Sequence, residues 1–139
     1  MTRFFLDTNV LLYAFDANAR KRKRAQDLIE NALTTHEGMI SSQVIQEFLN
    51  VATRKFATPL TDDEALRYFE LVLEPLCTSW TDAELYRRAL GLRSRFQFSI
   101  YDSLIVAAAL GGGCQTLYSE DLQTGQRIEA LTVIDPFKG

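Results

Sequence analysis

The pattern of apolar and polar positions predicts short buried strands that alternate with helices. Residues 3–6 form an apolar run that stops at the polar residues 7–9, which is typical of a buried strand and its exit turn. Short apolar runs at residues 38–41, 116–118 and 131–134 predict three further strands. Each run has only three or four residues, so the expected sheet has short strands.

Helical spacing and capping signals predict the helices between these strands. We expect Ser41 or Ser42 to cap the helix that follows, because a serine hydroxyl can accept a bond from a free amide. Glycines 111–113 should end the last helix, since glycine adopts the left-handed cap conformation without penalty. The expected helices cover residues 10–15, 20–33, 42 to about 56, 102–110, and two stretches that begin at the capping boxes Thr61–Glu64 and Thr81–Glu84. This alternation favours an α/β fold with a short parallel central sheet flanked by helices.

Length and composition restrict the class of protein. The chain of 139 residues has no internal repeat or Pro/Ser-rich linker, so we expect one domain over residues 1–139. No apolar run approaches the roughly 20 residues that a membrane helix needs. Asp7 comes too early for the apolar stretch of a signal peptide. Cys77 and Cys114 form no CxxC pair, and we expect them to be buried thiols in a reducing cytoplasm.

The net charge argues against one class of nucleic-acid binder. The chain has 15 Lys and Arg residues against 18 Asp and Glu residues, a net charge of −3. A protein that binds nucleic acid through its overall charge is usually basic. Any contact with nucleic acid must therefore come from a local patch.

Acidic residues at the ends of predicted elements are the main candidates for chemistry. Asp7 directly follows the first predicted strand, and Asp121 follows a later one. Ligand sites in open α/β sheets lie outside the carboxyl ends of the strands, so these two acids could share a crevice. Asp102 begins a buried helix, where its alternative role is that of a helix cap.

A fourth acid, Glu47, lies in the middle of a predicted helix and leans toward its apolar face, with Gln43 and Asn50 placed to orient it. The alternative is a glutamate at the edge of that face, in contact with water. Four like charges close together would destabilise the fold unless a divalent cation neutralised them. Oxygen ligands without Cys or His nearby indicate Mg²⁺ or Mn²⁺ rather than Zn²⁺. These residue types suit metal-assisted hydrolysis of a phosphodiester.

Four segments in order along the chain resemble the motifs of one known family. The sequence Asp7-Thr8-Asn9-Val10-Leu11-Leu12-Tyr13-Ala14 is similar to the opening motif of PIN-domain nucleases, especially the VapC-like toxins of toxin–antitoxin pairs. The other segments are residues 42–48, 101–109 and 117–122, and residues 133–137 resemble the closing strand of that family. The resemblance implies a PIN-like fold and a divalent-metal-dependent endoribonuclease that serves as the toxin of a type II toxin–antitoxin module.

The same resemblance implies roles for particular residues. It makes Asp7, Glu47, Asp102 and Asp121 the catalytic acids that bind Mg²⁺ or Mn²⁺. A family pattern of a hydroxyl residue, any residue and then Asp selects Asp121 rather than Glu120. Three polar residues match positions that support the acids: Thr8, Asn9 and Ser119. The family further implies an RNA substrate, a homodimer and a cognate antitoxin protein.

One basic block is a candidate contact for the RNA backbone or for an acidic antitoxin tail, because Lys and Arg contacts to phosphate release counterions. The alternative is a solvated helix start. Basic residues are unfavourable at the N-terminus of a helix dipole, which favours the functional interpretation. The block consists of Arg20, Lys21, Arg22, Lys23 and Arg24.

Two alternatives come from other classes. A phosphotransferase of the haloacid-dehalogenase type also has an Asp after its first strand, but it needs a second Asp two residues on, where Asn9 stands. The second alternative is a catalytically silent PIN-like scaffold that binds RNA or a protein. Four clustered, mutually repelling carboxylates argue against a scaffold, because mere binding does not require them.

Overall fold

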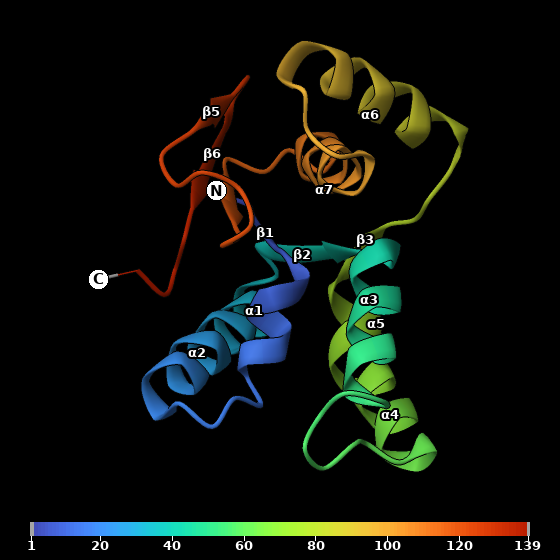
Figure 1. The fold of residues 1–139 in the computed structure, drawn as a ribbon, viewed down its shortest axis with the longest axis vertical. Helices are drawn as coiled ribbons and strands as arrows, with labels where there is room; N and C mark the ends of the chain where they lie inside the picture. Colours follow the sequence, from blue (N-terminus) through green and yellow to red (C-terminus); the bar gives the residue numbers. More distant parts are fainter. Residues whose placement is uncertain (1, 139) are drawn as a thin grey trace.

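The computed structural model describes residues 2–138, which form one six-stranded sheet with helices on both faces (Figure 1). The strands lie in the order β3-β2-β1-β4-β6-β5. All neighbours are parallel except β5 and β6, so the parallel α/β sheet predicted from the sequence is confirmed with one antiparallel edge. The strands are β1 (Phe4–Leu6), β2 (Gly38–Ser41), β3 (Cys77–Ser79), β4 (Thr116–Tyr118), β5 (Arg127–Ile128) and β6 (Leu131–Ile134).

Strand β1 lies inside the sheet, with Phe4 opposite Gly38 of β2 on one side and opposite Thr116 of β4 on the other. Because both faces of β1 are buried, its sequence is continuously apolar. The chain goes from β1 to β2 in one direction and later returns to β4 on the other side. The carboxyl ends of β1 and β4 therefore form a topological switch point, where ligands of open α/β sheets bind.

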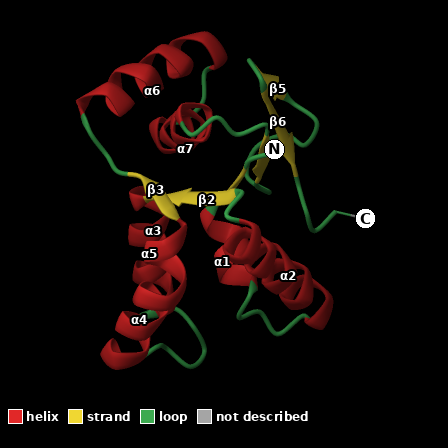
Figure 2. Cartoon of the chain, turned by 180° about the vertical axis from the view of Figure 1, so that it is seen from behind, coloured by secondary structure: helices red, strands yellow, loops and turns green. Residues whose placement is uncertain are grey.

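Helices cover both faces of this sheet. Two views from opposite sides place α1 and α2 on one face and α6 and α7 on the other, with α3 alongside α4 and α5 (Figures 1 and 2). None of the helices within residues 2–138 is long and apolar enough to cross a membrane. The helices are α1 (Thr8–Tyr13), α2 (Ala19–Thr35), α3 (Ser42–Ala52), α4 (Asp62–Tyr68), the π-helical turn η1 (Phe69–Leu73), α5 (Glu74–Leu76), α6 (Ala83–Phe96) and α7 (Ile100–Gly111).

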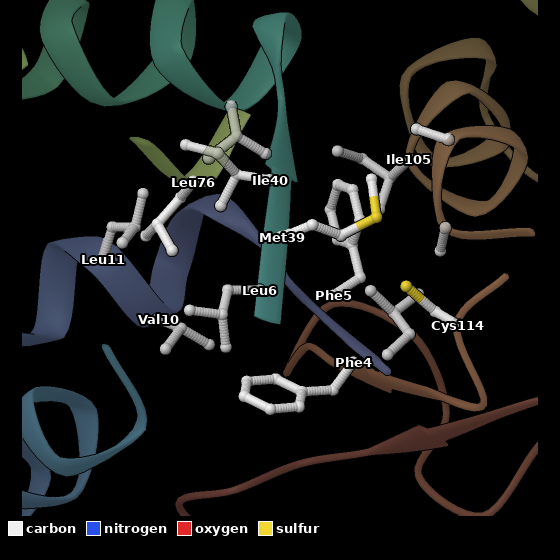
Figure 3. Close-up of a cluster of buried hydrophobic side chains, with 14 of the residues drawn as sticks. Phe4, Phe5, Leu6, Val10, Leu11, Met39, Ile40, Leu76, Ile105 and Cys114 are labelled. Carbon is white, nitrogen blue, oxygen red and sulfur yellow. The ribbon is translucent and has the colours of Figure 1, made fainter. Parts of the chain in front are cut away.

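The hydrophobic core fills the space between the sheet and its two helical layers (Figure 3). Phe5 and Met39 lie with Ile105 of α7 on one side, whereas Leu6 lies near Val10 of α1 on the other. This division follows from the alternation of side chains along a strand. Each of these side chains is at most 2% exposed, and burying one contributes about 1.5–3 kcal/mol. The end of β1, where Asp7 follows, is therefore held firmly.

Several predicted boundaries are wrong. The sequence pattern misses β3, a three-residue strand that contains polar residues, and β5, which has only two residues. The first helix begins at Thr8 rather than at residue 10, because Asp7 caps it. Helix α3 ends at Ala52 rather than near Phe56.

Two predicted helix caps are also wrong. Ser41 is the N-cap residue of α3 but makes no side-chain capping bond, while the Ser42 hydroxyl accepts from the Thr81 backbone N–H at 3.1 Å. Helix α6 is capped by Asp82, whose carboxylate accepts a first-turn N–H at 2.9 Å. Thr81 therefore ties the segment before α6 to the start of α3, instead of capping α6.

Candidate active site

Two of the predicted acids flank the switch point of the sheet. Asp7 follows β1 directly, and Asp121 lies in the turn that follows β4. The backbone N–H of Asp7 donates to the carbonyl of Tyr118 at 3.0 Å, which ties the ends of the two strands together. The topology thus brings both acids to the edge of the sheet where a ligand is expected.

Asp7 is the most buried of the four acids, with 4% of its surface exposed. Its Oδ1 accepts from the backbone N–H of Thr8 at 2.7 Å, and its Oδ2 accepts from the hydroxyl of Ser119 at 2.6 Å. Burial raises the pKa of Asp7 to about 7 against the lowering effect of these two bonds, and the carboxylates of Asp121 and Glu47 add to the rise. The fold therefore holds a carboxyl group whose charged form is unfavourable without a nearby cation.

Glu47 reaches this region from α3. Its Oε1 accepts from the hydroxyl of Thr8 at 2.6 Å, and its Oε2 accepts from the Gln43 side chain at 3.3 Å. The same Gln43 amide donates to the carbonyl of Tyr101 at 3.2 Å and so links α3 to the start of α7. Gln43 orients Glu47 as predicted, whereas Asn50 instead accepts from Arg54 at 3.4 Å.

Asp102 lies in the first turn of α7, and its backbone N–H donates to the capping hydroxyl of Ser99 at 3.0 Å. It is thus not the cap of its helix. Burial raises the pKa of the partly exposed Asp121, and the charges of Asp102, Glu120 and Glu47 act in the same direction. The four predicted acids therefore form one electrostatically coupled group, although they come from four different elements.

Asn9 lies next to this group, and the hydrogen bonding of its side-chain amide is incomplete. Both its Oδ1 and its Nδ2 are buried, and neither has a hydrogen-bond partner of good geometry. Its amide still lies close enough to Asp121 to lower the pKa of that carboxyl. A buried amide with open bonding capacity is costly unless something else binds there.

Within the described part of the chain, the four acids have no basic side chain as an ion-pair partner. The ion pairs within residues 2–138 involve other acids, and no basic side chain pairs with Asp7, Glu47, Asp102 or Asp121. In that part of the chain no group of three or more Asp, Glu, His or Cys side chains has the arrangement of a complete metal-binding set. Mg²⁺ does not require one, because it usually binds one or two carboxylates and keeps several waters. The oxygen-only donors and the open Asn9 amide fit such an ion.

A cavity of about 720 Å³ opens next to this region, although none of the four predicted acids lines it. Asn9 of the first motif and Glu120, which precedes Asp121, both line it, together with the aromatic rings of Tyr13, Phe15 and Phe56. Phe15 is 41% exposed, so part of this aromatic wall is open to solvent. The space is large enough for a ligand of nucleotide size.

The basic block at the start of α2 makes contacts within the chain. Arg20 and Arg24 donate to the carbonyls of Phe137 and Pro136 at 3.1 and 3.2 Å, and Arg22 donates to the carbonyl of Asp16 at 2.8 Å. The Lys21 ammonium lies 4.7 Å from the ring centre of Tyr13, and Lys23 pairs with Asp27. The block thus holds the C-terminal segment against α2. Its contact with RNA or an antitoxin stays a prediction.

One contact near the acids has no signal in the sequence. The hydroxyl of Tyr13, at the end of α1, donates to Oε1 of Glu120 at 2.6 Å. Glu120 is thereby engaged by Tyr13, while the neighbouring Asp121 is coupled to the other acids. The partners are 107 positions apart, so only the folded chain reveals the pair.

Known structures share this fold. A chain of a toxin–antitoxin complex from Klebsiella pneumoniae is 19% identical, with a TM-score of 0.70 over 97% of this chain and 98% of that one. DNA-bound VapBC from Salmonella typhimurium matches at 21% identity and a TM-score of 0.67, over 98% and 99%. VapC20 from Mycobacterium tuberculosis, described as a sarcin-ricin loop cleaving toxin, matches at 18% and 0.63, over 84% and 88%. At such identities the likeness establishes the fold alone.

Sequence comparison identifies the family. No curated protein sequence matches the chain significantly. The model of the PIN domain family matches residues 4–127, which include Asp7, Glu47, Asp102 and Asp121. Because this match covers most of the chain and the fold agrees with it, the chain belongs to the PIN domain family.

Proposed function

We propose that this protein is a divalent-metal-dependent endoribonuclease and the toxin of a type II toxin–antitoxin pair. The observation that supports this proposal most is the acid group at the switch point. The pKa of Asp7 is raised to about 7, and none of the basic side chains within residues 2–138 pairs with the four acids. Such a group is costly in an empty site and favourable around a divalent cation.

Asp7, Glu47, Asp102 and Asp121 would hold Mg²⁺ or Mn²⁺. A bound ion of this kind neutralises charge on the phosphodiester and promotes deprotonation of the attacking water. The chain itself orients the carboxylates: Thr8 and Ser119 each bind one of them through a hydroxyl. Each carboxylate oxygen has two lone pairs, so an oxygen bound once keeps capacity for a cation. No side-chain nucleophile is needed.

The proposed partners follow from the related structures. Toxin–antitoxin complexes among them support an antitoxin protein as the partner, and VapC20, described as a sarcin-ricin loop cleaving toxin, supports an RNA as the substrate. The cavity beside the acids provides room for an unpaired nucleotide, whose base could stack on exposed aromatic rings. A homodimer is part of the same proposal.

Cleavage of RNA by the purified protein tests this function. Transfer, ribosomal and messenger RNA are each incubated with Mg²⁺, Mn²⁺ or EDTA, and Asp102→Asn, purified identically, controls for contaminating ribonuclease. We expect cleavage only with metal and only by the wild-type protein. Full activity of Asp102→Asn would contradict the metal assignment. Absence of wild-type cleavage together with absence of Mn²⁺ binding in calorimetry would favour the silent scaffold.

A further inference from the structure

The turn that carries Asp121 is held mainly by side chains. Within residues 2–138, none of the backbone N–H groups of residues 120–124 donates to a backbone carbonyl. The N–H of Asp121 instead donates to the Ser119 hydroxyl at 3.1 Å. The Asp121 side chain is itself exposed, so its position depends on where this turn is anchored.

Helix α1 anchors the turn at both of its ends. At the start of the helix, Asp7 accepts from the Ser119 hydroxyl at 2.6 Å. At its end, Tyr13 donates to Glu120 at 2.6 Å, a length typical of a hydroxyl bound to a charged carboxylate. Residues 119 and 120 are thus both fixed to α1 immediately before Asp121.

Tyr13 is itself well held. Its ring centre lies 4.4 Å from that of Phe137, and the Lys21 ammonium lies 4.7 Å from it. The pKa of Tyr13 is raised to about 12, chiefly because its hydroxyl is bonded to Glu120, so it remains a neutral donor at physiological pH. A rigid donor on a packed helix can therefore restrain a turn that has few bonds of its own.

We propose that Tyr13 is a positioning residue of the candidate active site, whose hydroxyl holds Glu120 and so presents Asp121 to the other three acids. This inference rests on the proposed function, because it concerns how the proposed metal-binding acids are arranged. Tyr13 acts through Glu120 and contacts neither the ion nor the reacting phosphate.

The test combines single and double variants, with RNA cleavage and Tm measured beside two main readouts. Calorimetry gives the Kd for Mn²⁺, and hydrogen exchange of the metal-free protein reports opening of residues 119–124. The variants are Tyr13→Phe, Glu120→Ala and the double variant. Tyr86→Phe is the matched control. It removes the hydroxyl of an exposed tyrosine on α6, far from the turn in sequence.

We expect Tyr13→Phe to weaken Mn²⁺ binding about tenfold, the lower end of what loss of an outer partner costs a metal site, and to speed exchange in the turn. Tyr13→Phe should have no further effect in the Glu120→Ala background, because the bond is already absent. Tyr86→Phe should match the wild type. Saturating Mn²⁺ should restore most of the RNA cleavage by Tyr13→Phe.

Three outcomes distinguish failure of this inference from failure of the proposed function. If the wild type binds Mn²⁺ and Tyr13→Phe binds it equally well with unchanged exchange, the positioning role is wrong while the metal site stands. A lowered Tm with an unchanged Kd also overturns the inference, because it shows a purely structural role. If the wild type binds no Mn²⁺, the proposed function fails and the inference fails with it.

Discussion

The side chain of Asp7 has both a structural role and a proposed role in metal binding. It caps α1, binds Ser119, and lies almost completely buried beside other acids. Burial raises its pKa to about 7, from 3.8 for the free side chain. The folded protein therefore binds a proton at Asp7 more tightly than the unfolded chain does.

This difference predicts how stability depends on pH. In EDTA, the free energy of unfolding should fall as pH rises from about 4 to about 7, because in that interval the unfolded chain releases the Asp7 proton while the folded protein retains it. Asp7→Asn should be less sensitive to pH and should gain on the wild type by on the order of 1–3 kcal/mol between pH 5 and pH 8. Urea unfolding of both proteins at the two pH values measures the gain. Parallel pH profiles would show that Asp7 does not titrate in this range.

At the scale of the elements, alanine substitutions at two glycines should change the stability of the protein in opposite directions. Gly38 begins β2 beneath α2, and a Cβ there would meet the Ala32 side chain and lie 2.7 Å from a ring carbon of Phe4. Gly91 lies in exposed α6 with nothing within 4 Å of such a Cβ. The first position thus depends on close packing, whereas the second does not.

Gly38→Ala should destabilise the protein by about 2–3 kcal/mol, because the α2 backbone or the Phe4 ring must move. Gly91→Ala should stabilise it by about 0.5–1 kcal/mol, since alanine favours the helix. Urea unfolding of both variants at one pH compares them. A neutral Gly38→Ala would mean that α2 does not pack against β2 as closely as described.

The elements that the sequence predicts are those whose local pattern is strong. Buried strands such as β1 are continuously apolar, and the capping box Thr61–Glu64 forms as expected. The sequence does not predict edge strands β3 and β5. Their two or three residues carry too little local pattern, and they form strands only because they pair with β2 and β6. The sequence predicts Thr81 as a helix cap, but in the fold its hydroxyl and backbone N–H are both hydrogen-bonded to the Ser42 hydroxyl.

At the scale of the whole molecule, parallel topology assembles the acid group from distant segments. The family motifs name Asp7, Glu47, Asp102 and Asp121, yet neither the Tyr13–Glu120 bond nor the link from Gln43 to α7 follows from spacing along the chain. The contacts of Arg20 and Arg24 with the C-terminal segment are likewise visible only in the fold. The sequence points to the candidate residues, while the contacts that support them become visible only in the structure.

The change in Tm on adding Mn²⁺ tests most directly whether the four acids together bind divalent metal, as one ion or as two. For the wild type we predict a rise of roughly 5–10 °C at a hundredfold excess over Kd, because the ion binds only the folded state. Asp7→Asn, Glu47→Gln, Asp102→Asn and Asp121→Asn should each lose most of this rise. Glu30→Gln, an exposed acid on α2, should keep it. A wild type that gains nothing, or variants at the four acids that gain as much as the wild type, would contradict metal binding by these acids.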